Sequence, residues 1–514
     1  MSLLKSTGVV GLMTLASRVL GFVRDVTMAA AFGVGLGMDA FLVAFMIPNF
    51  MRRLFAEGAF AQSFVPVFTE TKATKSAAEQ RQLVSVVSGT LGGVLLLVTV
   101  LGVAGAPLLF AMFAPGFGDE PGKHDLGVGL LRIMFPYLML ISLTAMVAGV
   151  LNSHGRFAIP ALAPALLNLC MIGAVWVNSG SIQMLAWAVL LAGFLQLGFQ
   201  LPALARLGLL ARPRWGWHDP QVSRIVQLML PILFGSSVAQ LSLLLNTALA
   251  SLIPGNGSVS WLYYADRVME FPLGIFSIAI ATVILPSLSA QHASQSQEKF
   301  SATLDWALRT LLLIGVPAML GLFFLAGPLV TTLFQYSRFT EQDVQMTRLA
   351  LMAYAFGFMG FSLVKVLVPG FFARQETRIP VRYGVIALSA GMAVSVSLTW
   401  ALIQAGYFAP HVALAISTSL SAFVNAGLLF WRLKHDGVYR PQPGWFAYGL
   451  RLLLASAAMS GLLVWLAGDL AAWLDAGVSL RALNLLVLIA LAAATYFAVL
   501  FAGGLRPRHL RHSL

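Results

Sequence analysis

Long apolar stretches separated by short polar segments run along nearly the whole chain. A helix needs about 20 apolar residues to cross the roughly 30 Å hydrocarbon core of a bilayer, and fourteen stretches meet this requirement. They cover residues 7–33, 38–66, 84–113, 127–151, 158–178, 183–205, 222–253, 259–288, 304–327, 345–372, 380–404, 411–432, 446–467 and 480–504. The pattern predicts an all-α polytopic membrane protein with about 14 transmembrane helices. A count of twelve or thirteen stays open, because the first two stretches and the eighth are the least hydrophobic.

The two halves of the chain repeat three proline-containing segments at an offset of about 220 residues. The matching pairs are AQSFVPVFTE with ATVILPSLSA (Pro66 and Pro286), APLLFAMF with GPLVTTLF (Pro107 and Pro328), and GRFAIP with TRIP (Pro160 and Pro380). Repeats of this kind are typical of transporters whose two lobes are related by an axis along the membrane normal. We therefore predict two six-helix lobes, residues 1–216 and 217–440, followed by two further helices in residues 441–514.

Composition supports the bilayer as the solvent of this chain, because 59% of the residues are hydrophobic and only 10% are charged. The mean hydropathy is +0.86, whereas a soluble domain has about a quarter of its residues charged. The formal net charge of +13 would suggest nucleic-acid binding in a soluble protein. Here the basic residues lie mostly in alternate short loops, as the positive-inside rule expects. This placement predicts no nucleic-acid partner and puts both termini in the cytoplasm.

The sequence contains no recognisable catalytic or metal-binding motif. A single cysteine, Cys170, excludes disulfides within the chain and thiolate metal sites. There is no Walker loop, no HExxH and no GxSxG, so we predict neither an enzyme nor a bound cofactor or metal. Transport would then draw on the membrane potential, a monovalent ion or the substrate gradient.

Ionisable residues inside the predicted spans are the candidates for function, because each charge at the bilayer centre costs about 2.5–3.5 kcal/mol on insertion scales. The first two spans contain Arg18, Arg24, Asp25, Asp39, Arg52, Arg53 and Glu57. The eighth span contains Asp266, Arg267 and Glu270, and Lys365 lies deep in the tenth. Such charges must face a water-filled cavity or each other.

Helical spacing assigns some of these residues to pairs. Arg53 and Glu57 are four residues apart, so we interpret them as a structural ion pair. Asp266 and Glu270 share a face of their helix, whereas Arg267 is displaced by one residue and is expected to point elsewhere.

The remaining arginines suit a phosphate ligand. A guanidinium is permanently charged and donates two parallel hydrogen bonds to phosphate oxygens. Arg18, Arg24, Arg52 and Arg267 therefore predict an anionic cargo, since an exporter of cationic drugs would need acidic or aromatic cavity walls. The alternative is that these arginines only join helices through ion pairs.

Several segments together resemble one family of membrane transporters. SRVLGFVRD, MDAFLVAFMIPNFMRRLFAEGAFAQSFVPVF, WLYYADRVMEFPLGIF, LPSLS and PGFFARQETRIP resemble the MurJ (MviN) lipid II flippases of the multidrug/oligosaccharidyl-lipid/polysaccharide (MOP) exporter superfamily. The resemblance covers essentially the whole chain. It implies fourteen helices, two six-helix lobes around a V-shaped cavity, alternating access, and a groove for the undecaprenyl tail shaped by helices 13 and 14.

The resemblance also implies site residues. The family's cavity arginines match Arg18, Arg24, Arg52 and Arg267 as substrate-binding residues. Asp25, Asp39, Glu57 and Glu270 match polar family positions, and Arg53, Ser260 and Lys365 are further supporting candidates. Some members carry lysine where this chain has Met46, which implies that a cation there is dispensable or replaced. Spans 11 and 12 contain no evident acidic ligand for sodium, which puts sodium coupling in doubt.

These implications predict a lipid II flippase of the bacterial inner membrane. It would carry the undecaprenyl-diphosphate-linked precursor from the cytoplasmic to the periplasmic leaflet, act as a monomer and contact membrane lipids. A related MOP exporter of polysaccharide lipid-linked units or drugs is the alternative, and a non-transporting membrane scaffold is a third interpretation.

Overall fold

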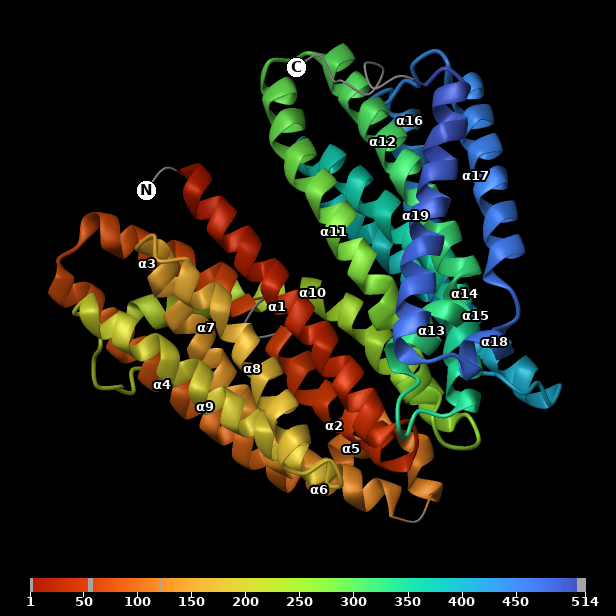
Figure 1. Ribbon diagram of the computed structural model, residues 1–514. Helices are drawn as coiled ribbons and strands as arrows, with labels where there is room; N and C mark the ends of the chain where they lie inside the picture. Colours follow the sequence, from red (N-terminus) through yellow and green to blue (C-terminus); the bar gives the residue numbers. More distant parts are fainter. Residues whose placement is uncertain (1–2, 54–58, 121, 506–514) are drawn as a thin grey trace. The chain divides into compact units, whose positions relative to one another are not determined.

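The computed structural model describes residues 3–53, 59–120 and 122–505. These residues form helices and short connections, with no strand among them (Figure 1). Ten helices within this part of the chain are long and apolar enough to cross a bilayer. The prediction of an all-α polytopic membrane protein is therefore confirmed, whereas the number of fourteen spans stays a prediction.

The chain divides into two compact units, Met1–Ser260 and Trp261–Leu514. The first unit is built from α1 (Leu3–Phe32), α2 (Leu36–Arg52), α3 (Ala61–Thr74), α4 (Ala77–Ala104), α5 (Ala106–Phe113), the 3-10 helix η2 (Pro115–Asp119), α6 (Lys123–Met134), α7 (Tyr137–Ser153), α8 (Ala158–Val177), α9 (Ile182–Arg206) and α10 (Pro220–Leu252). Within it, α1 packs on α8, α8 and α7 pack on α9, and α2 packs on α6.

The second unit begins within α11 (Ser258–Ala293), whose first residues end the first unit. It continues with α12 (Gln297–Phe324), α13 (Ala326–Phe334), α14 (Glu341–Phe372), α15 (Arg378–Gln404), α16 (Val412–His435), α17 (Trp445–Ala467), α18 (Leu470–Asp475) and α19 (Val478–Ala502). Here α14 packs against both α12 and α16, and α15 packs against α16. The last two long helices, α17 and α19, pack on each other (blue in Figure 1), and α12 joins them to the rest of the unit.

Aromatic spacing explains how the short helix α3 is held in the first unit. Phe60, Phe64 and Phe68 recur every four residues, so their rings share one face, with centroids 5.3 and 5.7 Å apart. All three belong to a buried cluster that also includes Val87 of α4 and Val150 of α7. An i, i+4 pattern of phenylalanines that is visible in the sequence thus contributes part of the core of this unit.

Two of the three repeated proline pairs occupy matching places in the two units, whereas Pro66 lies in the short helix α3 and Pro286 in the long helix α11. Gly105 separates α4 from α5 and Leu325 separates α12 from α13, and each short second helix carries a repeat proline near its start, Pro107 or Pro328. Pro160 and Pro380 are each the third residue of their helices, α8 and α15. Proline is tolerated there because the first turn of a helix has no internal partner for its N–H groups.

Helix α10 packs on α3, α4, α5 and η2, and so belongs to the first compact unit. The predicted lobe boundary at residues 216 and 217 follows the sequence repeat rather than packing, and it stays a prediction.

Candidate functional site

Helix α1 presents Arg24 to α8, where the arginine is only 7% exposed. Its Nε and Nη2 donate to Oδ1 of Asp25 at 2.9 and 2.6 Å, and its Nη1 donates to Oδ1 of Asn168 at 3.0 Å. The amide of Asn168 in turn donates to the backbone oxygen of Ser17 at 3.1 Å. Arg24 is therefore neutralised by its own helix and oriented by an amide of α8, as a buried guanidinium requires.

The other arginines of the first two predicted spans are more accessible. Arg18 is exposed on α1, six residues before Arg24. Arg52 is half-buried at the last residue of α2, and its Nε and Nη2 donate to Oδ1 of Asn49 at 2.9 and 2.7 Å. Arg53 is exposed, and its predicted partner Glu57 lies outside the described residues, so the structure does not describe that pair.

Asp39 caps the start of α11 from the first turn of α2. The carboxylate is 1% exposed and accepts from the backbone N–H groups of Gly257 at 2.8 Å and Ser260 at 3.0 Å. It also accepts from the Ser260 hydroxyl at 2.6 Å. A carboxylate at a helix N-terminus satisfies N–H groups that have no partner within the helix and complements the positive end of its dipole. The structure thus joins two of the predicted supporting residues, Asp39 and Ser260.

A lysine that sequence reasoning missed completes this cluster. Lys123 opens α6, is 0% exposed, and places its Nζ 3.3 Å from Oδ2 of Asp39. The same ammonium donates to Oδ1 of Asn256 at 2.8 Å, lies 3.4 Å from Oε2 of Glu120, and sits 3.8 Å from the centroid of the Phe117 ring. A fully buried lysine is tolerated only with such partners, so these contacts tie α2, α6 and the start of α11 together.

In the second unit, α11 carries Arg267 and Glu270 as an ion pair. Arg267 Nη1 donates to Oε2 of Glu270 at 2.7 Å, and its guanidinium carbon lies 4.9 Å from the ring centroid of Tyr263. The expectation that Arg267 points away from Glu270 is therefore wrong, because residues three apart on a helix are also neighbours. Lys365, the last supporting candidate, is partly buried in α14.

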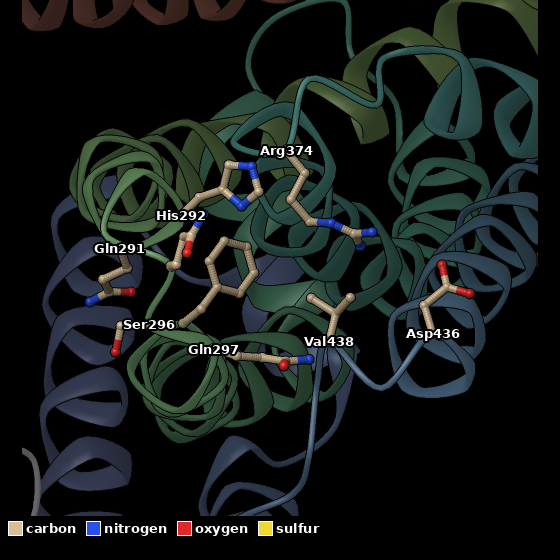
Figure 2. A pocket seen from close by; sticks show the side chains of 9 residues that line it. Gln291, His292, Ser296, Gln297, Arg374, Asp436 and Val438 are labelled. Carbon is tan, nitrogen blue, oxygen red and sulfur yellow. The ribbon is translucent and has the colours of Figure 1, made fainter.

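A polar pocket of about 320 Å³ lies at the end of the second unit where α11 ends and α12 begins. Figure 2 shows His292, Gln297 and Arg374 around it. Its charges are balanced, since Arg374 pairs with Glu376 at 2.7 Å and Asp436 pairs with Arg432 at 2.9 Å. None of the predicted site residues lines this pocket, and no cluster of potential metal ligands occurs among the described residues.

Comparison with known proteins assigns the chain to a family. The sequence profile described as "Lipid II flippase MurJ" matches residues 28–483. A protein from Vibrio cholerae named "Probable lipid II flippase MurJ" is 45% identical over 522 aligned residues, which cover 99% of this chain and 98% of that protein. The chain belongs to the MurJ family. The "Lipid II flippase MurJ" of Burkholderia cenocepacia is 38% identical and covers 99% of both chains.

Solved structures share the fold of this MurJ-family chain. One described as "Lipid II flippase MurJ, inward closed conformation" matches with a TM-score of 0.78 at 23% identity, covering 96% of this chain and 99% of that one. An inward-facing multidrug resistance MATE family transporter of the MOP superfamily matches with a TM-score of 0.65 at 14% identity, covering 83% of this chain and 98% of that one. At these identities the likeness concerns the fold alone.

Three residues around the predicted site of this MurJ-family chain were not found from its sequence: Asn49, Lys123 and Asn168. Each is the partner of a predicted residue, namely Arg52, Asp39 and Arg24. Two of them, Lys123 and Asn168, stand out from the residues around them in the sequence. Lys123 is a lysine in the otherwise acidic loop GFGDEPGKHD, and Asn168 is a lone amide within an apolar run.

Proposed function

We propose that this chain flips lipid II, the undecaprenyl-diphosphate-linked peptidoglycan precursor, from the cytoplasmic to the periplasmic leaflet by alternating access. Membership of the MurJ family along nearly its whole length supports this proposal. The observation that carries it is the set of arginines in α1, α2 and α11, each oriented by a nearby side-chain oxygen: Arg24 by Asp25 and Asn168, Arg52 by Asn49, and Arg267 by Glu270.

The chemistry of these arginines matches a diphosphate. A guanidinium carries five N–H donors in a planar fork, which fits two phosphate oxygens at once. Inserting an arginine into a bilayer costs free energy. An arginine within a membrane span is therefore expected to serve a function. In this mechanism Arg24, Arg52 and Arg267, with Arg18, hold the diphosphate and sugar head while the two lobes rock to expose it on the other side.

The proposal also covers the undecaprenyl tail of lipid II and the energy source of transport. The undecaprenyl tail would stay at membrane depth along a groove shaped by α17 and α19, which share a buried core that includes Leu452, Met459 and Leu488. Membrane potential or a monovalent ion would drive the cycle. The positive-inside rule supports an inner-membrane protein with both termini in the cytoplasm, and the proposed working form is a monomer.

The test is complementation of a bacterial strain depleted of its own lipid II flippase. Compared at equal membrane levels of the protein, Arg24→Ala and Arg52→Ala should abolish growth, while Arg206→Ala, at an exposed arginine at the end of α9, should grow like the parent chain. Full growth of the Arg24→Ala, Arg52→Ala double variant would refute the arginine mechanism. Failure of the parent chain to rescue growth, with drug resistance gained instead, would favour a related MOP exporter.

A further inference from the structure

The second unit contains an apolar pocket of about 550 Å³, separate from the arginines and from the polar pocket. Its lining is almost entirely carbon and comes from α12, α14, α16 and the linker between α16 and α17 (residues 436–444) with the first residue of α17. The residues that matter here are Leu308, Leu363, Phe423, Gly427, Tyr439 and Trp445. The three helices that form its walls are among those long and apolar enough to span a bilayer.

One buried carboxylate turns the polar atoms of the rim away from this pocket. Asp305 of α12 is 1% exposed, and its Oδ1 accepts from the Tyr439 hydroxyl at 2.8 Å and from Nε1 of Trp445 at 2.7 Å. The backbone N–H of Gln442 donates to the same oxygen at 3.1 Å, and Arg309 pairs with Oδ2 at 2.7 Å. The two aromatic residues therefore offer their rings to the pocket while their donors are used elsewhere.

Burial keeps one of these donors protonated. Desolvation, with the neighbouring Asp305 carboxylate, raises the pKa of Tyr439 above its ordinary value of 10. The hydroxyl therefore stays a donor to Asp305 at every physiological pH, and the pocket gains no polar group by titration. A cavity lined by carbon has no partners for water and accommodates hydrocarbon.

Exposed basic residues are close in the chain to residues that line the pocket. Arg440, beside Tyr439 in the chain, is exposed, and so is Lys434 at the end of α16. The one acidic residue of the linker, Asp436, is already paired with Arg432. Positive loops at this end are what the positive-inside rule assigns to the cytoplasmic face, where anionic lipids attract lysine and arginine.

We propose that this pocket binds one acyl chain of an anionic phospholipid from the cytoplasmic leaflet, with the lipid phosphate at Arg440. The volume is within the usual range of about 300–1,000 Å³ for ligand sites in proteins. A bound chain would fill the space beside the linker and so brace the junction of α12 and α17. The proposal depends on the chain being in a bilayer, and it does not depend on which substrate the arginines carry.

Gly427 offers a direct way to fill the pocket. A Cβ at this position would meet no atom within 4 Å, so a leucine there projects into open space rather than into a neighbour. Gly449 on α17 has equally open surroundings and does not line the pocket, which makes it a matched control.

The experiment is native mass spectrometry of the purified, delipidated full chain with phosphatidylglycerol or phosphatidylcholine of identical oleoyl chains. The parent chain and Gly449→Leu should retain one phosphatidylglycerol, and Gly427→Leu should lose at least about tenfold in retention. Arg440→Gln should lower the preference for phosphatidylglycerol over phosphatidylcholine several-fold. Equal retention by Gly427→Leu, or equal binding of the two lipids by the parent chain, would overturn the proposal.

A second measurement covers the case in which Gly427→Leu does not fold. Phosphatidylglycerol with a photoreactive diazirine on its acyl chain should label peptides of α12 and α16 in the parent chain. Labelling confined to other helices would contradict the site. Loss of the label when undecaprenyl phosphate is added in equimolar amount would identify an isoprenoid tail as the occupant and also overturn the proposal.

Discussion

The ammonium of Lys123 and the carboxylate of Asp39 lie 3.3 Å apart, and the two residues are 0% and 1% exposed. They come from positions 84 residues apart in the chain, on α6 and α2. Because Asp39 also holds the N–H groups of Gly257 and Ser260, this pair fixes the point at which α11 begins. The start of α11 is thus anchored through a buried ion pair.

Replacing Lys123 with methionine should destabilise the protein by about 3–5 kcal/mol, because removal of one partner leaves a buried charge uncompensated. Asp39→Asn should be similarly costly. The measurement is thermal unfolding of the purified protein in detergent. In the double variant Lys123→Met, Asp39→Asn the loss should be clearly smaller than the sum of the single losses, since neither charge is then left alone. Simple additivity would show that the two side chains act independently.

Asn168→Leu should impair transport more than it impairs folding. The leucine removes the acceptor for Arg24 Nη1 and the donor to Ser17, which costs about 1–3 kcal/mol if a buried polar group stays unsatisfied. We expect reduced complementation at normal membrane levels, while Asn178→Ala at the exposed end of α8 should behave like the parent chain. If Asn168→Leu grew normally, the amide of α8 would not be what orients Arg24.

Two ion pairs of the second unit share the same i, i+4 spacing and differ in burial. Asp305 is 2% exposed at its side chain and Arg309 24%, whereas Asp436 and Arg432 are 18% and 37% exposed. Asp305→Ala should therefore cost about 3 kcal/mol or more, and Asp436→Ala about 1 kcal/mol or less, in the same unfolding assay. Equal losses would mean that Asp305 does not anchor the linker between α16 and α17.

The pair of Glu70 on α3 and Arg224 on α10 gives a pH prediction. The hydrogen bond from Arg224, followed by its charge, holds the pKa of Glu70 below its ordinary value. Since the folded-state pKa is the lower one, the stabilisation is complete above the ordinary pKa and is lost as the pH falls through the folded-state pKa. Glu70→Gln should thus lower the unfolding temperature slightly at pH 7 and not at pH 3. High salt should remove the difference at pH 7, because both side chains are exposed.

The apolar pattern predicted the fold class, and the matching proline-containing segments predicted the repeat. A run of about 20 apolar residues in a bilayer must satisfy its backbone hydrogen bonds within itself, and the α-helix does so. Helices therefore occur where the spans were predicted. The breaks at Gly105 and Leu325 sit just before prolines that had already been matched between the halves.

The partners of the charged residues could not be predicted, because they are set by packing between helices distant in sequence. Asn168 is 144 residues from Arg24, and Ser260 is 221 residues from Asp39. Spacing along one helix also led to a wrong expectation for Arg267, which pairs with Glu270, since both the third and the fourth residue along a helix are neighbours. The apolar pocket depends on Asp305 holding Tyr439 and Trp445 from another helix, which no periodicity reveals.

The most direct test of the arginine mechanism is a lipid II translocation assay in cells depleted of every other flippase. The quantity measured is the fraction of lipid II that an externally added lipid II-cleaving enzyme can reach. With the parent chain or Arg206→Ala this fraction should return to that of undepleted cells. With Arg24→Ala and Arg52→Ala together, at the same protein level, it should stay at that of depleted cells. Full exposure of lipid II by the double variant would contradict the account.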